Sequence, residues 1–171
     1  MNFNVISNKD LEEVKLINID YFKDFRGKIY TLYRESDFEN LGLPVFNHDK
    51  IVVSDSGVLR GIHGDFKTWK LVSCIYGSVE QVVVDCRPDS KSFKKWVKFT
   101  LNEGDGNLVL IPPGFGNAFL VTSHNKAIYN YKLSYAGDYF DSDKQFTYAW
   151  DDPDINIKWS INNPILSKRD K

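Results

Sequence analysis

The sequence predicts an all-β domain with the architecture of a barrel or a sandwich. Short segments rich in β-branched and aromatic residues recur along its 171 residues, and turns containing Gly, Pro and Asp separate them. Many short strands at fairly even spacing are typical of these two architectures. The aromatic content of 15%, with twelve Phe, nine Tyr and four Trp, suits an interior filled by large side chains.

The expected strands follow one another through the middle of the chain. They cover residues 28–33, 50–55, 70–77, 78–86, 95–101, 107–113, 117–123 and 126–135. Turn signals such as Gly77, Gly104-Asp105-Gly106 and Pro112-Pro113-Gly114 lie between them. Apolar and polar residues alternate imperfectly in 78–86, which agrees with a closed barrel whose two faces are both partly covered.

Short helices are expected near the N-terminus, and an extended wrap is expected at the C-terminal end. Residues 36–43 begin with a serine that can cap a helix, Glu39 completes a capping box, and Gly42 ends the turn. A second short helix is expected within residues 7–14. Residues 151–170 are rich in Asp, Asn and Pro, and we expect them to cover the barrel without regular structure.

The bulk composition indicates one domain over residues 1–171 and excludes several classes of partner. With 22 basic and 23 acidic residues, the formal net charge is −1, so no overall field attracts nucleic acid or an anionic membrane. Neither a signal sequence nor a long apolar run occurs, and a cytoplasmic, soluble protein is expected. Cys74 and Cys86 lie in apolar segments away from any C-x-x-C pair, so we expect two buried reduced thiols and no metal site.

Three polar segments interrupt the strand-like sequence. They are Arg60-Gly61-Ile62-His63, Lys70, and Tyr131-Lys132. At the ends of neighbouring strands their side chains could converge on one cavity. A single histidine in a strand is more often structural than catalytic, so spacing alone does not identify a general base.

The order of a larger set of motifs resembles the dTDP-4-dehydrorhamnose 3,5-epimerase family. The motifs are D-x-R-G (24–27), V-L-R-G-I-H (58–63), K-L-V (70–72), G-S-V-x-x-V-V-V-D-x-R (77–87), S-F-x-x-W (92–96), I-P-P-G-F (111–115), Y-K (131–132), W-D-D-P-D-I-x-I-x-W (150–159) and L-S-x-x-D (166–170). Each motif is weak alone, and their common order carries the resemblance.

The resemblance implies a double-stranded β-helix, which is a jelly-roll barrel of the cupin type. It implies a homodimer in which an N-terminal strand crosses to the partner. The implied activity is that of an isomerase that epimerises C3, C5 or both in a nucleotide-linked 4-keto-6-deoxy sugar, without a cofactor. Such sugars are made for bacterial surface polysaccharides such as capsule or lipopolysaccharide.

The resemblance also assigns catalytic roles to four residues. His63 is the expected general base, and Asp170 is the carboxylate that orients it and favours its imidazolium form. Lys70 is expected to stabilise the enolate oxygen, and Tyr131 is the expected acid on the opposite face of the sugar. The chemistry suits these residue types. A C–H beside a ketone needs a base that titrates near neutral pH, and imidazole does so. A cation placed at the enolate oxygen contributes roughly 3–4 kcal/mol in the transition state.

Four further residues are the expected substrate-binding groups. Arg60 and Arg26 are expected to hold the sugar and diphosphate, with Arg26 reaching over from the neighbouring subunit. His48 and Asn117 occupy positions that face the substrate in the family. Both depart from the family pattern, because the stretch F-x-Q-D-N-x-S is altered at residues 46–52 and Asn117 replaces a histidine.

Further departures leave the substrate and the product open. The family segment R-G-x-F-x-E loses its aromatic and acidic residues at residues 26–31, and Asp65 replaces a glutamine. The expected proton-transfer residues are retained while the nucleotide-side residues differ, so the sequence allows a dTDP-linked hexose or a GDP-linked hexose or heptose. It also leaves open whether one carbon or two are epimerised.

Three other functions compete with epimerisation. A cupin-type, metal-dependent dioxygenase would have only His48, His63 and His124 as histidine ligands, without an H-x-H pair. A nucleotide-sugar 3,4-ketoisomerase would share the barrel and the enolate chemistry but move the carbonyl. A non-catalytic sugar-binding barrel would have no need of a base and an opposed acid.

Overall fold

The computed structural model describes residues 3–171, so the first two residues of the expected domain lie outside it. Its strands are β1 (Phe3–Ser7), β2 (Lys15–Ile19), β3 (Phe22–Asp24), β4 (Gly27–Ile29), β5 (His48–Asp55), β6 (Leu59–Gly64), β7 (Trp69–Tyr76), β8 (Ser78–Asp85), β9 (Trp96–Asn102), β10 (Asn107–Ile111), β11 (Phe115–Val121), β12 (Lys126–Ser134) and β13 (Phe146–Thr147). One α-helix, α1 (Glu35–Asn40), and one 3₁₀ turn, Ser142–Lys144, accompany them. The all-β prediction is therefore confirmed.

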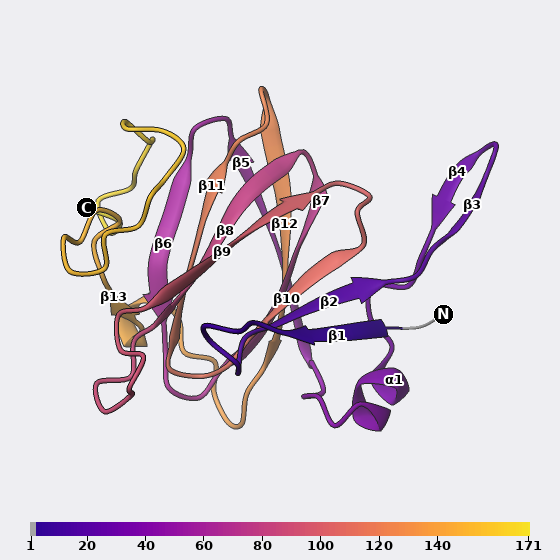
Figure 1. The fold of residues 1–171 in the computed structure, drawn as a ribbon, viewed down its shortest axis with the longest axis horizontal. Coiled ribbons are helices and arrows are strands. Elements are labelled where there is room, and N and C mark those ends of the chain that lie inside the picture. Colours follow the sequence, from indigo (N-terminus) through magenta and orange to yellow (C-terminus); the bar gives the residue numbers. More distant parts are fainter. Residues whose placement is uncertain (1–2) are drawn as a thin grey trace.

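Two antiparallel sheets face each other and form the barrel (Figure 1). One sheet has the strand order β1-β2-β10-β7-β12-β5, and the other has the order β13-β6-β11-β8-β9. Strands β3 and β4 form a separate hairpin that projects from the barrel, as Figure 1 shows. The first sheet is called the six-stranded sheet below, and the second is called the five-stranded sheet.

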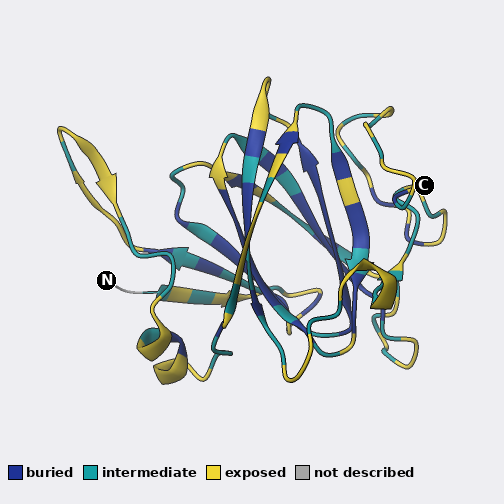
Figure 2. Cartoon of the chain, turned by 180° about the vertical axis from the view of Figure 1, so that it is seen from behind, coloured by how far each residue is buried: buried dark blue, intermediate teal, exposed yellow. Residues whose placement is uncertain are grey.

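Apolar side chains fill the space between the sheets and also cover both outer faces. The central cluster contains Val79 and Val83 of β8 together with Phe119 and Tyr129. Val82 on the same strand belongs to a different cluster, on the outer face of the five-stranded sheet. The imperfect alternation expected in 78–86 follows from this arrangement, because both faces of β8 are buried (Figure 2).

The C-terminal segment covers the outer face of the five-stranded sheet, as expected from its sequence. Ile155 and Ile157 are nearly buried there and pack with Ile62 and Val82. Burying such a side chain contributes about 1.5–3 kcal/mol relative to leaving it exposed. Trp96 Nε1 donates a hydrogen bond to the backbone oxygen of Ile155 at 3.0 Å, which fixes the segment to the end of the sheet.

The predicted helix near residue 40 is present with a different start. It begins at Glu35, and its N-cap is Arg34 without a side-chain capping bond, so the predicted serine cap at Ser36 is wrong. Gly42 has a φ of 66°, a conformation that glycine adopts without steric cost, and the helix ends before it as predicted.

One other expected element is wrong, and a second is shorter than expected. Residues 8–14 form turns instead of a helix, because the Asn8 side-chain oxygen accepts the backbone N–H groups of Asp10 and Leu11 at 2.8 and 3.2 Å. The strand expected over 28–33 ends at Ile29.

Two smaller findings bear on the sequence predictions. Cys74 and Cys86 are both free and buried, as predicted. In residues 3–171, no helix has the length and apolar character needed to cross a membrane.

Candidate active site

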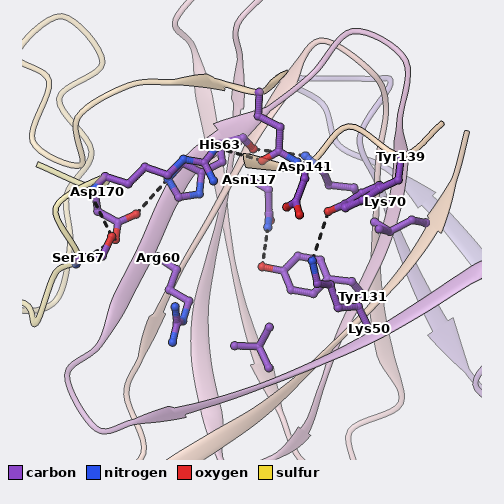
Figure 3. Close-up of a pocket in the computed structure, with 14 residues that line it drawn as sticks. Lys50, Arg60, His63, Lys70, Asn117, Tyr131, Tyr139, Asp141, Ser167 and Asp170 are labelled. Carbon is purple, nitrogen blue, oxygen red and sulfur yellow. Dashed lines mark hydrogen bonds and ion pairs between the residues drawn. The ribbon is translucent and has the colours of Figure 1, made fainter. Parts of the chain in front are cut away.

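A cavity of about 270 Å³ lies between the two sheets and holds most of the predicted site residues (Figure 3). Arg60 and His63 reach it from β6, and Asn117 reaches it from β11, both in the five-stranded sheet. Lys70 of β7 and Tyr131 of β12 reach it from the six-stranded sheet. Side chains from opposite sheets therefore meet across the same space.

His63 and Asp170 form the closest charged pair in the cavity. His63 Nε2 lies 3.0 Å from Asp170 Oδ1. The N–H is not well aligned with the oxygen, so the contact is electrostatic and becomes an ion pair when the ring is protonated. Because Nε2 faces the carboxylate, Nδ1 is the nitrogen left to accept a proton.

Asp170 is held by backbone and side-chain donors although it is the penultimate residue. Its Oδ1 accepts the backbone N–H of Gly61 at 3.1 Å, and its Oδ2 accepts the N–H and the hydroxyl of Ser167 at 3.1 and 2.5 Å. Burial alone would raise the pKa of this carboxyl group, but the contacts with His63, Ser167 and Gly61 outweigh burial and hold the pKa well below its usual range. Asp170 is therefore ionised at neutral pH.

Backbone pairing brings the C-terminal residues to β6. Ile165 bridges to Val58, and its backbone exchanges hydrogen bonds with Leu59 at 3.0 Å and Gly57 at 2.8 Å. The backbone N–H of Trp150 also donates to the oxygen of Asp170 at 3.3 Å. These contacts place Asp170 beside His63.

An irregularity in the pairing of β6 with β11 sets the directions of Arg60 and His63. His63 pairs with Asn117 and Arg60 with Phe119, so three steps along β6 match two steps along β11. In a regular strand, residues three apart point to opposite faces, and the bulge allows both side chains to face the cavity. Gly61 lies between them with a φ of 124°, and a Cβ there would lie 2.6 Å from Ala118 Cα, so only glycine fits.

Lys70 is a buried cation beside the histidine. Its Nζ donates to the backbone oxygen of His63 at 3.3 Å. Burial lowers the pKa of Lys70 to about 8, and the nearby charge of Asp65 partly opposes the shift. At neutral pH the side chain is mainly an ammonium group, which can stabilise negative charge that develops in the cavity.

Tyr131 lies one strand away from Lys70 on the same sheet, since β12 pairs with β7. Burial raises the pKa of its hydroxyl, while the charge of Arg60 acts in the opposite direction. The hydroxyl is therefore protonated at rest. Asn117 Nδ2 donates to this oxygen at 3.5 Å (Figure 3).

The structure does not bring Arg26 or His48 into the cavity lining of this chain. Arg26 lies on the β3–β4 hairpin, where its side chain is 74% exposed and pairs with Asp24 at 2.6 Å. His48 begins β5, and its Nδ1 lies 3.0 Å from the hydroxyl of Tyr135. The hairpin carries Arg26 away from its own barrel, and the contact with Tyr135 keeps His48 at the rim.

Sequence reasoning missed several polar residues that line the cavity. Lys50 Nζ lies 3.4 Å from the Tyr139 hydroxyl, and Arg169 donates to Gln145 Oε1 at 3.0 Å. Lys50 stands at the start of an expected strand, and Arg169 precedes the aspartate of the L-S-x-x-D motif, so both positions were visible in the sequence. Their convergence on the cavity depends on the fold.

Asp85 and Arg87 form a structural ion pair at the end of β8. Arg87 Nη2 lies 2.8 Å from Asp85 Oδ2, and Ser90 and Ser92 also donate to this oxygen, each at 2.6 Å. Within residues 3–171, no three His, Cys, Asp or Glu side chains are grouped so that they could hold a metal ion. This finding gives the dioxygenase alternative no support.

Sequence comparison finds similarity to one family of enzymes. The profile of the dTDP-4-dehydrorhamnose 3,5-epimerase family matches residues 8–171. The dTDP-4-dehydrorhamnose 3,5-epimerase of Escherichia coli K12 is 37% identical over 168 residues, which cover 95% of this chain and 89% of that protein.

Solved structures give the same result. The dTDP-6-deoxy-D-glucose-3,5-epimerase of Legionella pneumophila, in complex with dTDP-4-keto-L-rhamnose, is 32% identical with a TM-score of 0.89, over 99% of this chain and 90% of that one. The dTDP-4-dehydrorhamnose 3,5-epimerase of Bacillus anthracis, with TDP and pyrophosphate bound, is 29% identical with a TM-score of 0.90, over 99% and 97% of the two chains. The cupin-type barrel expected from the sequence is thereby confirmed.

Proposed function

This chain belongs to the dTDP-4-dehydrorhamnose 3,5-epimerase family and is a nucleotide-sugar epimerase, and we propose that its substrate is a dTDP-linked 4-keto-6-deoxyhexose. The reaction inverts C3, C5 or both through an enolate. The names of the relatives support the dTDP-linked substrate, while a GDP-linked hexose or heptose is the alternative that the test below must separate. The product serves the synthesis of a bacterial surface polysaccharide.

One observation carries the proposed mechanism. His63 and Tyr131 enter the same cavity from opposite sheets, so a sugar ring between them would meet a base on one face and an acid on the other. Inversion of a carbon requires this arrangement, because the proton leaves from one face and another arrives on the opposite face.

The first half of the reaction removes a proton from the carbon beside the ketone. His63 Nδ1 takes this proton, and the electron pair of the C–H bond moves to form the enolate. Asp170 stabilises the imidazolium that results, since the carboxylate is ionised and lies 3.0 Å from the other ring nitrogen. The ammonium group of Lys70 stabilises the negative charge on the former ketone oxygen.

The second half returns a proton to the opposite face. Tyr131 donates its hydroxyl proton to the carbon as the enolate returns to the ketone, and the tyrosine becomes a phenolate. After the product leaves, the His63 imidazolium releases its proton to water and the phenolate takes one from water, so both groups return to their resting forms. Cations that line the cavity, Lys50, Arg60 and Arg169, are the groups that we propose for the diphosphate.

The experiment that tests the function is incubation with 4-keto nucleotide sugars in deuterated water. We expect deuterium at C3 or C5 of the dTDP-linked sugar, with the ketone still at C4, and less label in the GDP-linked sugar. A carbonyl that has moved would identify a 3,4-ketoisomerase. Binding without any label would identify a non-catalytic barrel and would refute the proposal.

We also propose that the protein is a homodimer that works in the cytoplasm. The β3–β4 hairpin supports the dimer, since it projects from the barrel (Figure 2). Its side chains of Phe22, Phe25 and Ile29 are exposed by 60%, 98% and 64%. These exposed apolar side chains along a projecting hairpin would be buried against a second copy, which Arg26 in the turn of the hairpin could then reach. Light scattering should give twice the mass of the chain, and Phe25→Asp should shift the mass toward a monomer. Cell fractionation tests the location.

A further inference from the structure

A chain of buried amide groups runs behind the Tyr131 hydroxyl. Gln81 of β8 and Asn117 of β11 come from the five-stranded sheet, whereas Tyr129 and Tyr131 come from β12 of the six-stranded sheet. Gln81 is fully buried and Asn117 is 5% exposed. Buried polar groups of this kind need partners, and their hydrogen bonds cross between the two sheets.

The direction of every hydrogen bond in this chain follows from one backbone carbonyl. Gln81 Nε2 donates to the backbone oxygen of Val82 at 3.0 Å. A carbonyl oxygen only accepts hydrogen bonds, so the nitrogen end of the Gln81 amide must face Val82. The same nitrogen donates to Asn117 Oδ1 at 2.6 Å, while Gln81 Oε1 accepts the hydroxyl of Tyr129. The oxygen of Asn117 therefore faces Gln81.

The orientation of Asn117 then determines what Tyr131 receives. With Oδ1 turned to Gln81, Nδ2 faces Tyr131 and donates to its hydroxyl oxygen at 3.5 Å (Figure 3). Because the Tyr131 oxygen accepts a hydrogen bond from Asn117, its own proton is free to point into the cavity. Asn117 is neutral, so it donates in the same way before and after Tyr131 gives up its proton.

We propose that Gln81 and Asn117 are positioning residues that direct the Tyr131 proton toward the substrate and stabilise the phenolate formed when it is transferred. The inference rests on the function proposed above and deepens it, because it concerns the step of inversion and not the step of exchange. Burial raises the pKa of Tyr131, and the charge of Arg60 and the contact with Asn117 both act against this rise. A donor to the phenolate makes the tyrosine a stronger acid.

The decisive variant is Asn117→Leu, since leucine is similar in size and fills the same buried position without a donor. Deuterium exchange and configuration are measured on the same recovered sugar by NMR. Asn117 lines the cavity, so both rates are compared with the substrate fully bound, and inversion should fall by about 10-fold or more relative to exchange, the effect expected for the loss of a hydrogen bond to a charged group. The ratio of inversion to exchange is therefore the quantity that reports on Asn117.

Two further variants separate positioning from packing. Asn117→His should restore much of the ratio, because one imidazole nitrogen can accept from Gln81 while the other donates to Tyr131. Gln81→Leu leaves Asn117 in place but removes the group that orients its amide, so the ratio should fall again; this variant also serves if Asn117→Leu does not fold.

The possible outcomes distinguish this inference from the function on which it rests. If the leucine variants invert as efficiently as wild type, or lose exchange and inversion in equal measure, the positioning role is wrong. A wild-type protein that neither exchanges nor inverts would overturn the proposed function, and this inference with it.

Discussion

Replacing Asp170 by asparagine tests the pair that it forms with the general base, His63. All contacts to this carboxylate come from donors: His63 and the N–H of Gly61 at Oδ1, and the N–H and hydroxyl of Ser167 at Oδ2. In Asp170→Asn, an NH₂ group replaces one of the two carboxylate oxygens. In either orientation of the amide, this NH₂ group faces a backbone N–H, of Gly61 or of Ser167, that cannot turn away. The substitution therefore removes a charge and also leaves a buried donor without an acceptor.

The magnitudes follow from the distance and the burial. Two unit charges 3.0 Å apart interact by about 5 kcal/mol at an effective dielectric constant near 20. The side chain of His63 is 20% exposed, so solvent screens part of this energy, and we expect a loss of about 3–4 kcal/mol of imidazolium stabilisation. Exchange should then slow by roughly 10²–10³-fold. The unpaired donor should lower the free energy of unfolding by about 1–3 kcal/mol.

The assay measures deuterium exchange under single-turnover conditions and the free energy of unfolding in urea, for Asp170→Asn beside Ser167→Ala. The control variant loses a donor to the same carboxylate but retains the charge, so its exchange should stay within about 10-fold of wild type. If Asp170→Asn exchanges as fast as Ser167→Ala, the charge of Asp170 does not assist His63 and the reasoning is wrong.

The pH dependence of stability offers a second check on the same carboxyl group. Its pKa in the folded protein lies below the usual value, so the stabilisation is fully present above about pH 4 and is lost as the pH falls toward the folded value. Asp170→Asn should lack this part of the acid sensitivity.

Further predictions concern the three other proposed catalytic groups. His63→Asn should abolish exchange at every labelled carbon with the fold intact, and residual exchange above about a hundredth of wild type would contradict its role as the base. Lys70→Ala should lower kcat far more than it raises KM, because the charge that Lys70 meets develops only in the transition state; a collapse of affinity with unchanged turnover would make it a phosphate ligand. The pKa of Lys70 is lowered to about 8, so its ammonium form is lost as the pH rises through that value. The kcat of the wild type should therefore fall near pH 8, and in Lys70→Arg this fall should move to higher pH. Tyr131→Phe should exchange without inverting, while Tyr135→Phe, which alters a hydroxyl bonded to His48, should do both; equal inversion by the two variants would mean that another group supplies the second proton.

The sequence alone was sufficient for the fold class and the family resemblance, and it led to a prediction of the reacting side chains. Strand-length apolar segments separated by turns predicted the all-β barrel, because alternation and turn chemistry are local properties of the chain. The ordered motifs led to His63, Lys70, Tyr131 and Asp170, and the fold places all four around one cavity.

Local signals were less reliable near the N-terminus. Residues 7–14 contain helix-favouring side chains, yet Asn8 satisfies the neighbouring backbone N–H groups itself and a turn forms. The strand expected from residue 28 to 33 is cut short where the chain leaves the β3–β4 hairpin, and Tyr33 packs beside Phe38 instead, with ring centroids 4.9 Å apart. In both segments, contacts made by single side chains with residues a few positions away override the propensity of the segment.

Only the tertiary structure decided how the site is assembled, because its parts are far apart in the chain. Backbone pairing of Ile165 beside β6 brings Asp170 to His63, and no local pattern encodes that contact. The bulge between β6 and β11 turns Arg60 toward the same cavity, although a spacing of three residues along a regular strand would point it away. The hydrogen bonds from Gln81 through Asn117 reach the opposite sheet at Tyr131, so the series is complete only once the barrel has closed.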